Sequence, residues 1–427
     1  MNIPAQPAGG SSVLAELSWR GLLFQSTEEL APALAAAPLS GYCGFDPTAA
    51  SLHVGNLVAI MALMHLQRAG HRPVALVGGG TGMIGDPSGK NTERQLLPPD
   101  VIAANARALG RQLERFLDFG GPRPAILRDN AAWLMPLGAV DFLRDVGKHF
   151  SVNYMLAKDS VKTRLEGGIS FTEFSYMLLQ AYDFLELYRR DGVTLQLGGS
   201  DQWGNITAGI ELIRRTEGVA AHALTVPLLT TASGAKFGKT EVGAVWLDPA
   251  RTSPYQFYQF WVNTDDRDVV GHLGRFTLLE HGRIQELESS VDARPERREA
   301  QRTLAADVTS RVHGETQARA AAEVSESLFG KGDVRTLSRE ALAVLESEIP
   351  FHPLAPQAEY DVITLFVTAQ LAASGGAARR LLQQGGLSVN GERLPADQRS
   401  IPHDRALGGG YFLLKKGARD FALLRAQ

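Results

Sequence analysis

The feature that most constrains the fold is a regular alternation, between residues 40 and 230, of short apolar runs with longer stretches of helical periodicity. The clearest apolar runs are Pro73–Val77, Ala125–Leu127 and Thr194–Leu197. The clearest helical stretches are Leu57–Arg68, Val101–Leu117 and Phe174–Leu187. Strands that alternate with helices form a parallel sheet with helices on both faces. The sequence therefore predicts an α/β fold with a doubly wound parallel sheet.

The rest of the chain has a different pattern. Between residues 254 and 348 strand signals fade, and Leu304, Val308 and Val312 recur every four positions, as on a helix face. The segment PFHPLAPQ contains three prolines and is typical of a linker. After it, SGGAARRLLQQGGLSVNGERL predicts a short helix, a glycine stop, and a strand that ends in an Asn390-Gly391 hairpin turn.

These patterns divide the chain into three domains and a linker. We expect a doubly wound domain at 1–245, an α-helical domain at 246–348, a linker at 349–358 and a small α+β module at 359–427. The module carries nine Lys/Arg and six Asp/Glu, a net +3 in a chain of net charge −3. A basic module on an acidic body favours a polyanionic partner, although a solvated charged face explains the charge equally well.

The composition excludes several classes of protein. Of the 427 residues, 44% are apolar and 21% charged, and no apolar run approaches the roughly 18 residues of a membrane helix. The first residues, MNIPAQPAGGSS, lack the basic and then apolar order of a signal peptide. A single cysteine, Cys43, excludes an internal disulfide and a zinc site made of several cysteines. We expect a cytoplasmic protein with no membrane partner.

The segment GGGTGMIGDPSGK, residues 78–90, follows an apolar run and suggests a nucleotide loop. Gly80, Gly82 and Gly85 fit the dinucleotide pattern G-x-G-x-x-G, but the residues after them have turn chemistry where that pattern needs a helix. Its acidic ribose partner is missing as well, because the residues about 20 positions further on predict a helix start. A phosphate loop of the Walker type fails at Ile84 and Asn91. A plain turn between strand and loop remains the simpler interpretation, and an NAD enzyme is disfavoured.

Three further motifs decide the interpretation: HVGN at 53–56, GSDQWGN at 199–205 and KFGKT at 236–240. HVGN stands at a predicted helix start, where free amides and a positive dipole favour phosphate. HVGN and KFGKT resemble the HIGH and KMSKS signatures of class I aminoacyl-tRNA synthetases. With GFDPTAASLHVGN, GDPSGK, YMLLQAYD and GSDQWGN, the chain is similar to bacterial-type tyrosyl-tRNA synthetases over nearly its whole length.

The resemblance implies a Rossmann-like catalytic domain, a helical domain on the anticodon side and a C-terminal RNA-binding module. It implies activation of L-tyrosine by ATP to tyrosyl-adenylate and pyrophosphate, followed by transfer of tyrosine to the 3′ end of tRNA(Tyr). A homodimer is implied too. Mg²⁺ would accompany ATP, since no cluster of carboxylates marks a metal site built by the protein.

The resemblance also assigns site residues. Those implied to bind tyrosine are Tyr42 and Asp183 at the phenol, Asp86, Tyr176 and Gln180 at the ammonium, and Gln202 at the carboxyl. Those implied to bind ATP are Cys43, Gly44, Asp46, His53, Gly55, Asn56, Gly199, Asp201, Lys236 and Lys239. Those implied to act on the reacting phosphates are Thr48, His53, Asn56, Lys90, Arg94, Lys236, Lys239 and Thr240. Without the resemblance, Asp183 would be interpreted as a carboxylate on a helix surface.

The chain departs from the family pattern at Asn56, which stands where the last histidine of HIGH is expected, and at Ala59, which offers packing alone. An asparagine amide can still offer an N–H near the position of the imidazole N–H. Two rival functions remain. A tryptophanyl-tRNA synthetase shares the architecture but does not explain Tyr42 with Asp183, and a non-catalytic RNA-binding paralogue does not explain the signature residues.

Overall fold

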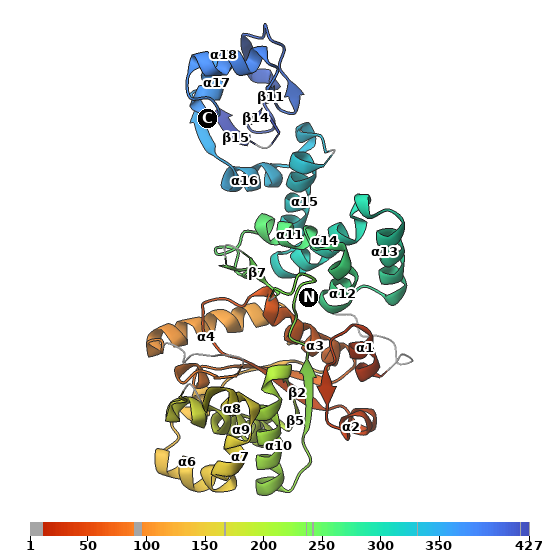
Figure 1. The fold of residues 1–427 in the computed structure, drawn as a ribbon, viewed down its shortest axis with the longest axis vertical. Coiled ribbons are helices and arrows are strands. Elements are labelled where there is room, and N and C mark those ends of the chain that lie inside the picture. The colour runs from red at the N-terminus through yellow and green to blue at the C-terminus, as the bar shows by residue number, and fades with distance from the viewer. Residues whose placement is uncertain are drawn as a thin grey trace. The chain divides into compact units, whose positions relative to one another are not determined.

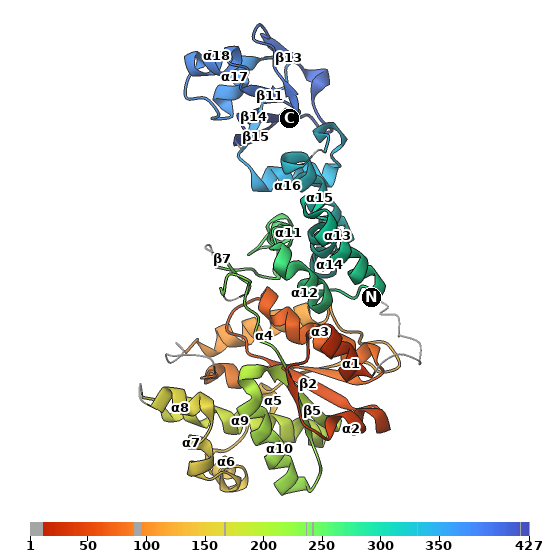
Figure 2. The same ribbon diagram turned by 45° about the vertical axis from the view of Figure 1, so that its right-hand side comes forward.

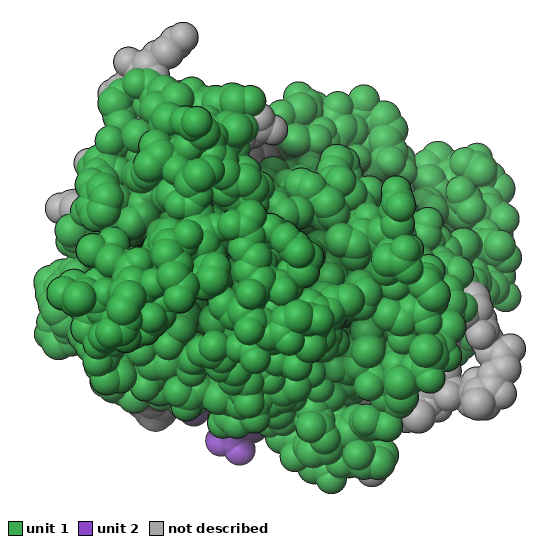
Figure 3. All heavy atoms as spheres, turned by 90° about the horizontal axis from the view of Figure 1, so that it is seen from below, with its two compact units in different colours: residues 1–251, 265–295 green, residues 252–264, 296–427 purple. Residues whose placement is uncertain are grey.

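The computed structural model describes residues 12–88, 96–165, 168–235, 237–240, 243–330, 332–418 and 420–426. The chain forms two compact units, one of residues 1–251 and 265–295 and one of residues 252–264 and 296–427 (Figure 3). In the part of the chain that the structure describes, no helix is both long and apolar enough to cross a membrane.

The first unit is built on a six-stranded sheet with the strand order β1-β6-β5-β2-β3-β4. Its strands are β1 (Gln25–Ser26), β2 (Ser40–Phe45), β3 (Arg72–Val77), β4 (Ile126–Asp129), β5 (Val193–Gly199) and β6 (His222–Val226). All neighbours pair in parallel except β1, which pairs antiparallel with β6. The prediction of a doubly wound parallel sheet is therefore confirmed.

Helices cover both faces of this sheet (Figures 1 and 2). On one face lie α3 (Leu57–Arg68) and α4 (Pro99–Leu113), and on the other lie α9 (Phe171–Asp191) and α10 (Trp203–Glu217). The apolar side chains of α3 are almost all buried, which explains why it lacks a polar face. The remaining helices of the unit are α1 (Val13–Trp19), α2 (Leu30–Ala36), α5 (Ala131–Leu134), α6 (Ala139–Asp145), α7 (Val152–Leu156), α8 (Asp159–Leu165), α12 (Asp266–Phe276) and α13 (His281–Ala293).

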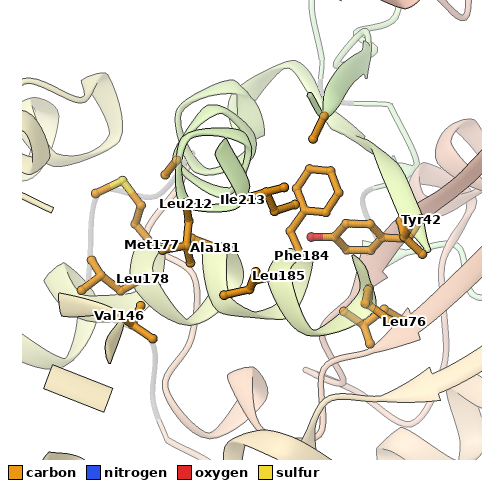
Figure 4. Close-up of a cluster of buried hydrophobic side chains, with 14 of the residues drawn as sticks. Tyr42, Leu76, Val146, Met177, Leu178, Ala181, Phe184, Leu185, Leu212 and Ile213 are labelled. Carbon is orange, nitrogen blue, oxygen red and sulfur yellow. The ribbon is translucent and has the colours of Figure 1, made fainter. Parts of the chain in front are cut away.

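The 21-residue helix α9 carries Tyr176, Gln180 and Asp183, and its ends are fixed by local chemistry. Ser170 accepts a hydrogen bond from the Glu173 amide at the start, and Gly192 ends the helix with a left-handed backbone, φ +64°. Its apolar side chains pack with α10 and β2 in one core, in which the ring of Phe184 lies 5.3 Å from that of Tyr42 (Figure 4). Tight packing holds α9 in a fixed position beside the sheet.

The second unit contains a helical part and a C-terminal sheet. Its helices are α11 (Pro254–Val262), α14 (Glu299–His313), α15 (Glu315–Phe329), α16 (Arg339–Glu348), α17 (Val362–Thr368) and α18 (Gly375–Gln383). Its five-stranded sheet has the order β12-β11-β14-β15-β9, and its strands are β9 (Phe351–Leu354), β11 (Leu387–Val389), β12 (Glu392–Arg393), β14 (Tyr411–Lys416) and β15 (Asp420–Ala426). Two short strands, β10 (Glu359–Asp361) and β13 (Ser400–Pro402), pair separately. The expected hairpin turn is present, since Val389 pairs with Glu392 across Asn390-Gly391.

Two features differ from the expected division into domains. Helices α12 and α13, expected in the helical domain, have most of their contacts in the first unit. Part of the expected linker forms β9, which pairs in parallel with β15. The sequence argument failed there because β9 is an edge strand, where a proline such as Pro353 is tolerated.

Candidate active site

A pocket of ≈ 280 Å³ opens at the carboxyl ends of β2 and β5. The strand order reverses at β2, with β3 on one side and β5 on the other, and a crevice at such a switch point is where α/β proteins bind ligands. The pocket is lined by Tyr42, Gly44, Phe45, Asp46, Thr48, His53, Asn56, Leu76, Gly78, Thr81, Asp86, Asn130, Tyr176, Gln180, Asp183, Gln196, Leu197 and Gln202. Eleven of these are residues that the sequence assigned to the site.

One end of the pocket is buried and holds a carboxylate. Asp183, 2% exposed, accepts hydrogen bonds from Trp133 Nε1 at 2.8 Å and Asn130 Nδ2 at 2.9 Å. Burial raises its pKa to about 8, against the lowering effect of these two donors. The hydroxyl of Tyr42, 1% exposed, has no hydrogen-bond partner among the described residues. Burial, with the nearby Asp183, holds the pKa of Tyr42 well above its usual range.

Two further carboxylates, Asp46 and Asp86, lie further along the pocket. The hydroxyl of Tyr176 donates to Asp46 Oδ2 at 2.8 Å, and burial together with Asp46 and Asp86 raises its pKa. Asp86 accepts from Gln202 Nε2 at 2.6 Å and from the Ser88 amide at 2.9 Å. Two carboxylates and several carbonyl or hydroxyl oxygens around one space favour a bound cation such as an ammonium group.

The HVGN segment forms η1 (Val54–Asn56), a short 3₁₀ turn directly before α3. Asn56 Oδ1 accepts a hydrogen bond from the His53 amide at 2.9 Å, so the Asn56 side chain caps this turn. The amide-to-ribose contact expected of Asn56 stays a prediction.

The segment after KFGKT pairs with HVGN. The Val54 amide donates to the Val245 carbonyl at 3.0 Å, and the Val245 amide donates to the Gly238 carbonyl at 3.1 Å. Gly238 has φ +78°, and a Cβ there would lie 2.6 Å from Val54 Cγ2. The two signature segments are therefore in direct contact, and this contact requires glycine at position 238.

The other expected residues flank the pocket or cannot be placed. Cys43 is buried on β2 with its pKa raised to about 12 by burial, so it is a neutral thiol. A side chain at Gly55 would place its Cβ 2.9 Å from the His53 ring, and one at Gly199 would place its Cβ 2.6 Å from Asp201 Oδ1. Both glycines therefore lie directly against an expected site residue. Lys90, Arg94 and Lys236 lie outside the described residues, as do the side chains of Lys239 and Thr240.

Sequence reasoning missed four polar side chains that line the pocket or support it: Thr81, Asn130, Trp133 and Gln196. Gln196 faces the pocket from a buried strand beside Tyr42, and its Oε1 has no hydrogen-bond partner in the described part of the chain. A polar residue inside the apolar run Thr194–Leu197 was the available signal for it. No group of His, Cys, Asp or Glu side chains suited to a metal ion occurs among the described residues.

Comparison with known proteins agrees with this geometry. Residues 35–330 match the family described as tRNA synthetases class I (W and Y), and residues 342–424 match the tyrosine–tRNA ligase SYY-like C-terminal domain. A tyrosine–tRNA ligase of Anaeromyxobacter dehalogenans (strain 2CP-1 / ATCC BAA-258) is 54% identical over 418 residues, which are 97% of this chain and 100% of the relative. One from Bacillus caldotenax is 51% identical over 97% of this chain and 99% of its own.

Among solved structures, a C-terminally truncated mitochondrial tyrosyl-tRNA synthetase of Aspergillus nidulans matches with a TM-score of 0.69 and 30% identity, over 75% of this chain and 95% of its own. A tryptophanyl-tRNA synthetase of Encephalitozoon cuniculi, 13% identical with a TM-score of 0.54 over 72% of this chain and 87% of its own, shares the fold alone. The chain belongs to the class I tRNA synthetases of the tryptophan and tyrosine group and, within that group, to the tyrosine–tRNA ligases.

Proposed function

We propose that this protein activates L-tyrosine with ATP and transfers it to the 3′ end of tRNA(Tyr). The observation that carries the proposal is the buried end of the pocket, which combines the Asp183 carboxylate with the unpartnered hydroxyl of Tyr42 among the described residues. A phenol satisfies both groups, because its O–H donates to Asp183 while its oxygen accepts from Tyr42. Phenylalanine offers neither bond, and an indole N–H only donates, so tryptophan leaves Tyr42 unpaired.

The other end of the pocket suits the amino-acid head group. In this proposal Asp86, Tyr176 and Gln180 surround the tyrosine ammonium, which places a negative charge and two acceptors around a cation. Tyr176 and Gln180 stand one turn apart on α9 and therefore face the same space. Gln202 Nε2 donates to Asp86 Oδ2 at 2.6 Å in the structure. When the tyrosine ammonium binds Asp86 in place of this amide, the Gln202 amide turns to the tyrosine carboxyl group.

Two displacement steps complete the reaction. An oxygen of the tyrosine carboxylate attacks the α-phosphorus of ATP, the bond to the β-phosphate oxygen breaks, and pyrophosphate leaves with the electron pair. A hydroxyl of the terminal tRNA ribose then attacks the tyrosyl carbonyl carbon and releases its proton to water. The bond between this carbon and the adenylate phosphate oxygen breaks, and AMP leaves with the electron pair. No side chain acts as a nucleophile, so the protein accelerates both steps by positioning and by stabilising charge.

ATP occupies the side of the pocket next to HVGN. In this proposal the adenosine and its ribose are surrounded by Asp46, Cys43, Gly44, Gly55, Asn56, Gly199 and Asp201. The charge on the phosphates is stabilised as pyrophosphate forms. In this proposal four basic residues, Lys90, Arg94, Lys236 and Lys239, act there together with Thr48, His53 and Thr240. Mg²⁺ arrives bound to ATP as part of the substrate.

We also propose a division into a catalytic, a helical and a C-terminal part, with α12 and α13 grouped with the first unit. The proposal includes the binding of tRNA by the basic C-terminal module and a cytoplasmic location. A homodimer is supported by large apolar side chains that are exposed on one stretch of the first unit. They are Met135, Val140, Leu143, Val152, Leu165 and Phe171, the last of which is 77% exposed. Exposed large apolar side chains that gather in one segment favour an interface between chains. Sedimentation should give the mass of two chains, and a single-chain mass would remove this part of the proposal.

The decisive experiment is amino-acid-dependent exchange of pyrophosphate into ATP, measured with each of the twenty amino acids. Exchange with tyrosine, weak or absent exchange with phenylalanine and tryptophan, and charging of tRNA(Tyr) in a second assay are expected. Exchange with tryptophan alone, or with none of them, would overturn the proposal.

A further inference from the structure

The turn after β3 brings three polar side chains together: Asp46, Thr81 and Asn130. Its first residue, Gly78, lies under the contact between Asp46 and Thr81, and a Cβ at this position would overlap Asp46 Oδ1 and Thr81 Oγ1. Thr81 itself is 2% exposed and lines the pocket. Glycine is therefore needed at position 78 for the two side chains to meet.

Thr81 joins two carboxylates at opposite ends of the pocket. Its hydroxyl donates to Asp46 Oδ1 at 2.7 Å and accepts from Asn130 Nδ2 at 2.9 Å. The same Asn130 nitrogen donates its second hydrogen to Asp183 Oδ2 at 2.9 Å. The amides of Gly80 and Thr81 hold the Asn130 oxygen, at 2.7 and 3.4 Å.

The resulting network is continuous and every bond in it has one possible direction. A carboxylate only accepts and the Asn130 amide nitrogen only donates, so the Thr81 proton must point to Asp46. Tyr176 adds its own hydrogen bond to the other oxygen of Asp46 at 2.8 Å. The network thus runs from Asp183, through Asn130 and Thr81, to Asp46 and Tyr176.

This arrangement places Thr81 between the phenol end and the head-group end of the pocket. We propose that Thr81 is a positioning residue for tyrosine activation, whose hydroxyl fixes Asn130 toward Asp183 and Asp46 toward Tyr176, so that phenol recognition and the orientation of the amino-acid head group are set by one rigid element. The inference rests on the proposed function and adds a determinant of rate and selectivity that does not touch the substrate.

Removing the hydroxyl has two consequences. Thr81→Val keeps the shape of the side chain but leaves Asn130 with an unpaired N–H and Asp46 with one donor fewer. A buried group left unsatisfied, such as this N–H, costs on the order of 1–3 kcal/mol. Asn130 then loses one of the contacts that aim it at Asp183 and keeps those from the Gly80 and Thr81 amides. Because a hydrogen bond donated to a carboxylate favours its charged form, the pKa of Asp46 rises when Thr81 no longer donates to it.

The test compares Thr81→Val and Thr81→Ser with a matched control, Thr277→Val. Thr277 is also fully buried, and its hydroxyl likewise both donates, to the Leu273 carbonyl at 2.6 Å, and accepts, from the Leu279 amide at 3.3 Å. It is not a residue of the pocket. Pyrophosphate exchange with tyrosine and with phenylalanine, its pH profile, and thermal unfolding are measured for all three variants.

Thr81→Val should lower kcat/KM for tyrosine about tenfold or more, reduce the preference for tyrosine over phenylalanine, and move the acid limb of the pH profile to higher pH. Thr81→Ser should restore all three to within about threefold of the parent. Thr277→Val should lower the unfolding temperature and leave kcat/KM and selectivity unchanged. Should Thr81→Val fail to fold, Thr81→Ala, which relieves the apolar contact, should show the same losses.

A Thr81→Val protein as active and selective as the parent would overturn the proposal, and so would a Thr81→Ser protein as impaired as Thr81→Val. A structural role alone would lower the unfolding temperature of Thr81→Val with an unchanged pH profile and unchanged selectivity, which also overturns it. Failure of the proposed function is seen separately, because the parent itself would then show no tyrosine-dependent exchange.

Discussion

The pocket carboxylate Asp183 should make the folded protein less stable as the pH rises, and Asp183→Asn should remove this effect. Burial raises its pKa from 3.8 to about 8 in the folded protein, so the neutral form is favoured there. Between these values the unfolded chain carries an ionised carboxylate and the folded chain a protonated one. Folding then takes up a proton, and the free energy of unfolding falls with pH, by about 1.4 kcal/mol per pH unit.

The size of the effect follows from the shift of about four units, which corresponds to roughly 5–6 kcal/mol across the whole range. Asparagine at this position is neutral at every pH. Its amide nitrogen meets one of the two donors, Trp133 or Asn130, and that mismatch costs on the order of 1–3 kcal/mol at any pH. The free energy of unfolding of Asp183→Asn minus that of the parent should therefore rise by about 4 kcal/mol from pH 5 to pH 8 and level off above pH 8.

Denaturant unfolding at pH 5, 6, 7, 8 and 9, followed for parent and variant side by side, measures this difference. Titrating groups that do not interact with Asp183 contribute equally to both proteins and cancel. The control is Asp292→Asn on α13, an exposed carboxylate whose replacement should give a difference near zero at every pH. A difference between Asp183→Asn and parent that stays constant within about 1 kcal/mol from pH 5 to pH 8 would refute the reasoning.

Three further outcomes are expected. Tyr42→Phe should reduce the ratio of kcat/KM for tyrosine to that for phenylalanine by about tenfold to hundredfold in pyrophosphate exchange, and an unchanged ratio would remove Tyr42 from phenol recognition. Lys239→Ala should lower kcat far more than it raises KM for ATP, whereas a loss confined to ATP affinity in single-turnover experiments would contradict a role in the transition state. Truncation after Gln357 should spare exchange and impair tRNA charging in a salt-dependent manner, and equal charging by both forms would remove the module from tRNA binding.

The elements of the first unit were largely predictable from the sequence because their signals are local. The helix expected at Leu57–Arg68 has these bounds in the structure, and the strand expected at Pro73–Val77 begins one residue earlier. The two-residue turn at Asn390-Gly391 also depends only on its own residues, both of which have positive φ. Local periodicity and turn chemistry are sufficient for features of this kind.

The supports of the site were not predictable, because they depend on contacts between distant segments. Asn130 and Trp133 hold Asp183 across about 50 residues of sequence, and no spacing rule connects them. The plain interpretation of Asp183 as a surface carboxylate was wrong for the same reason. A helix buried on several sides, like α9, has no polar face to which the residue could be assigned.

The glycine-rich turn illustrates how a sequence pattern and its physical cause can differ. GGGTGMIGDPSGK looks like a phosphate loop because glycines let a ligand approach the backbone. In the structure, side chains of the protein make this close approach: Asp46 and Thr81 lie over Gly78, and Asp129 lies over Gly79 and accepts its amide hydrogen at 3.1 Å. Glycine is required whenever any group lies against the backbone, and the pattern does not show whether that group belongs to a ligand or to the protein. That group is identified only by the neighbouring strands. Here β2 and β4 flank β3, and their carboxyl ends bring Asp46 and Asp129 to the turn.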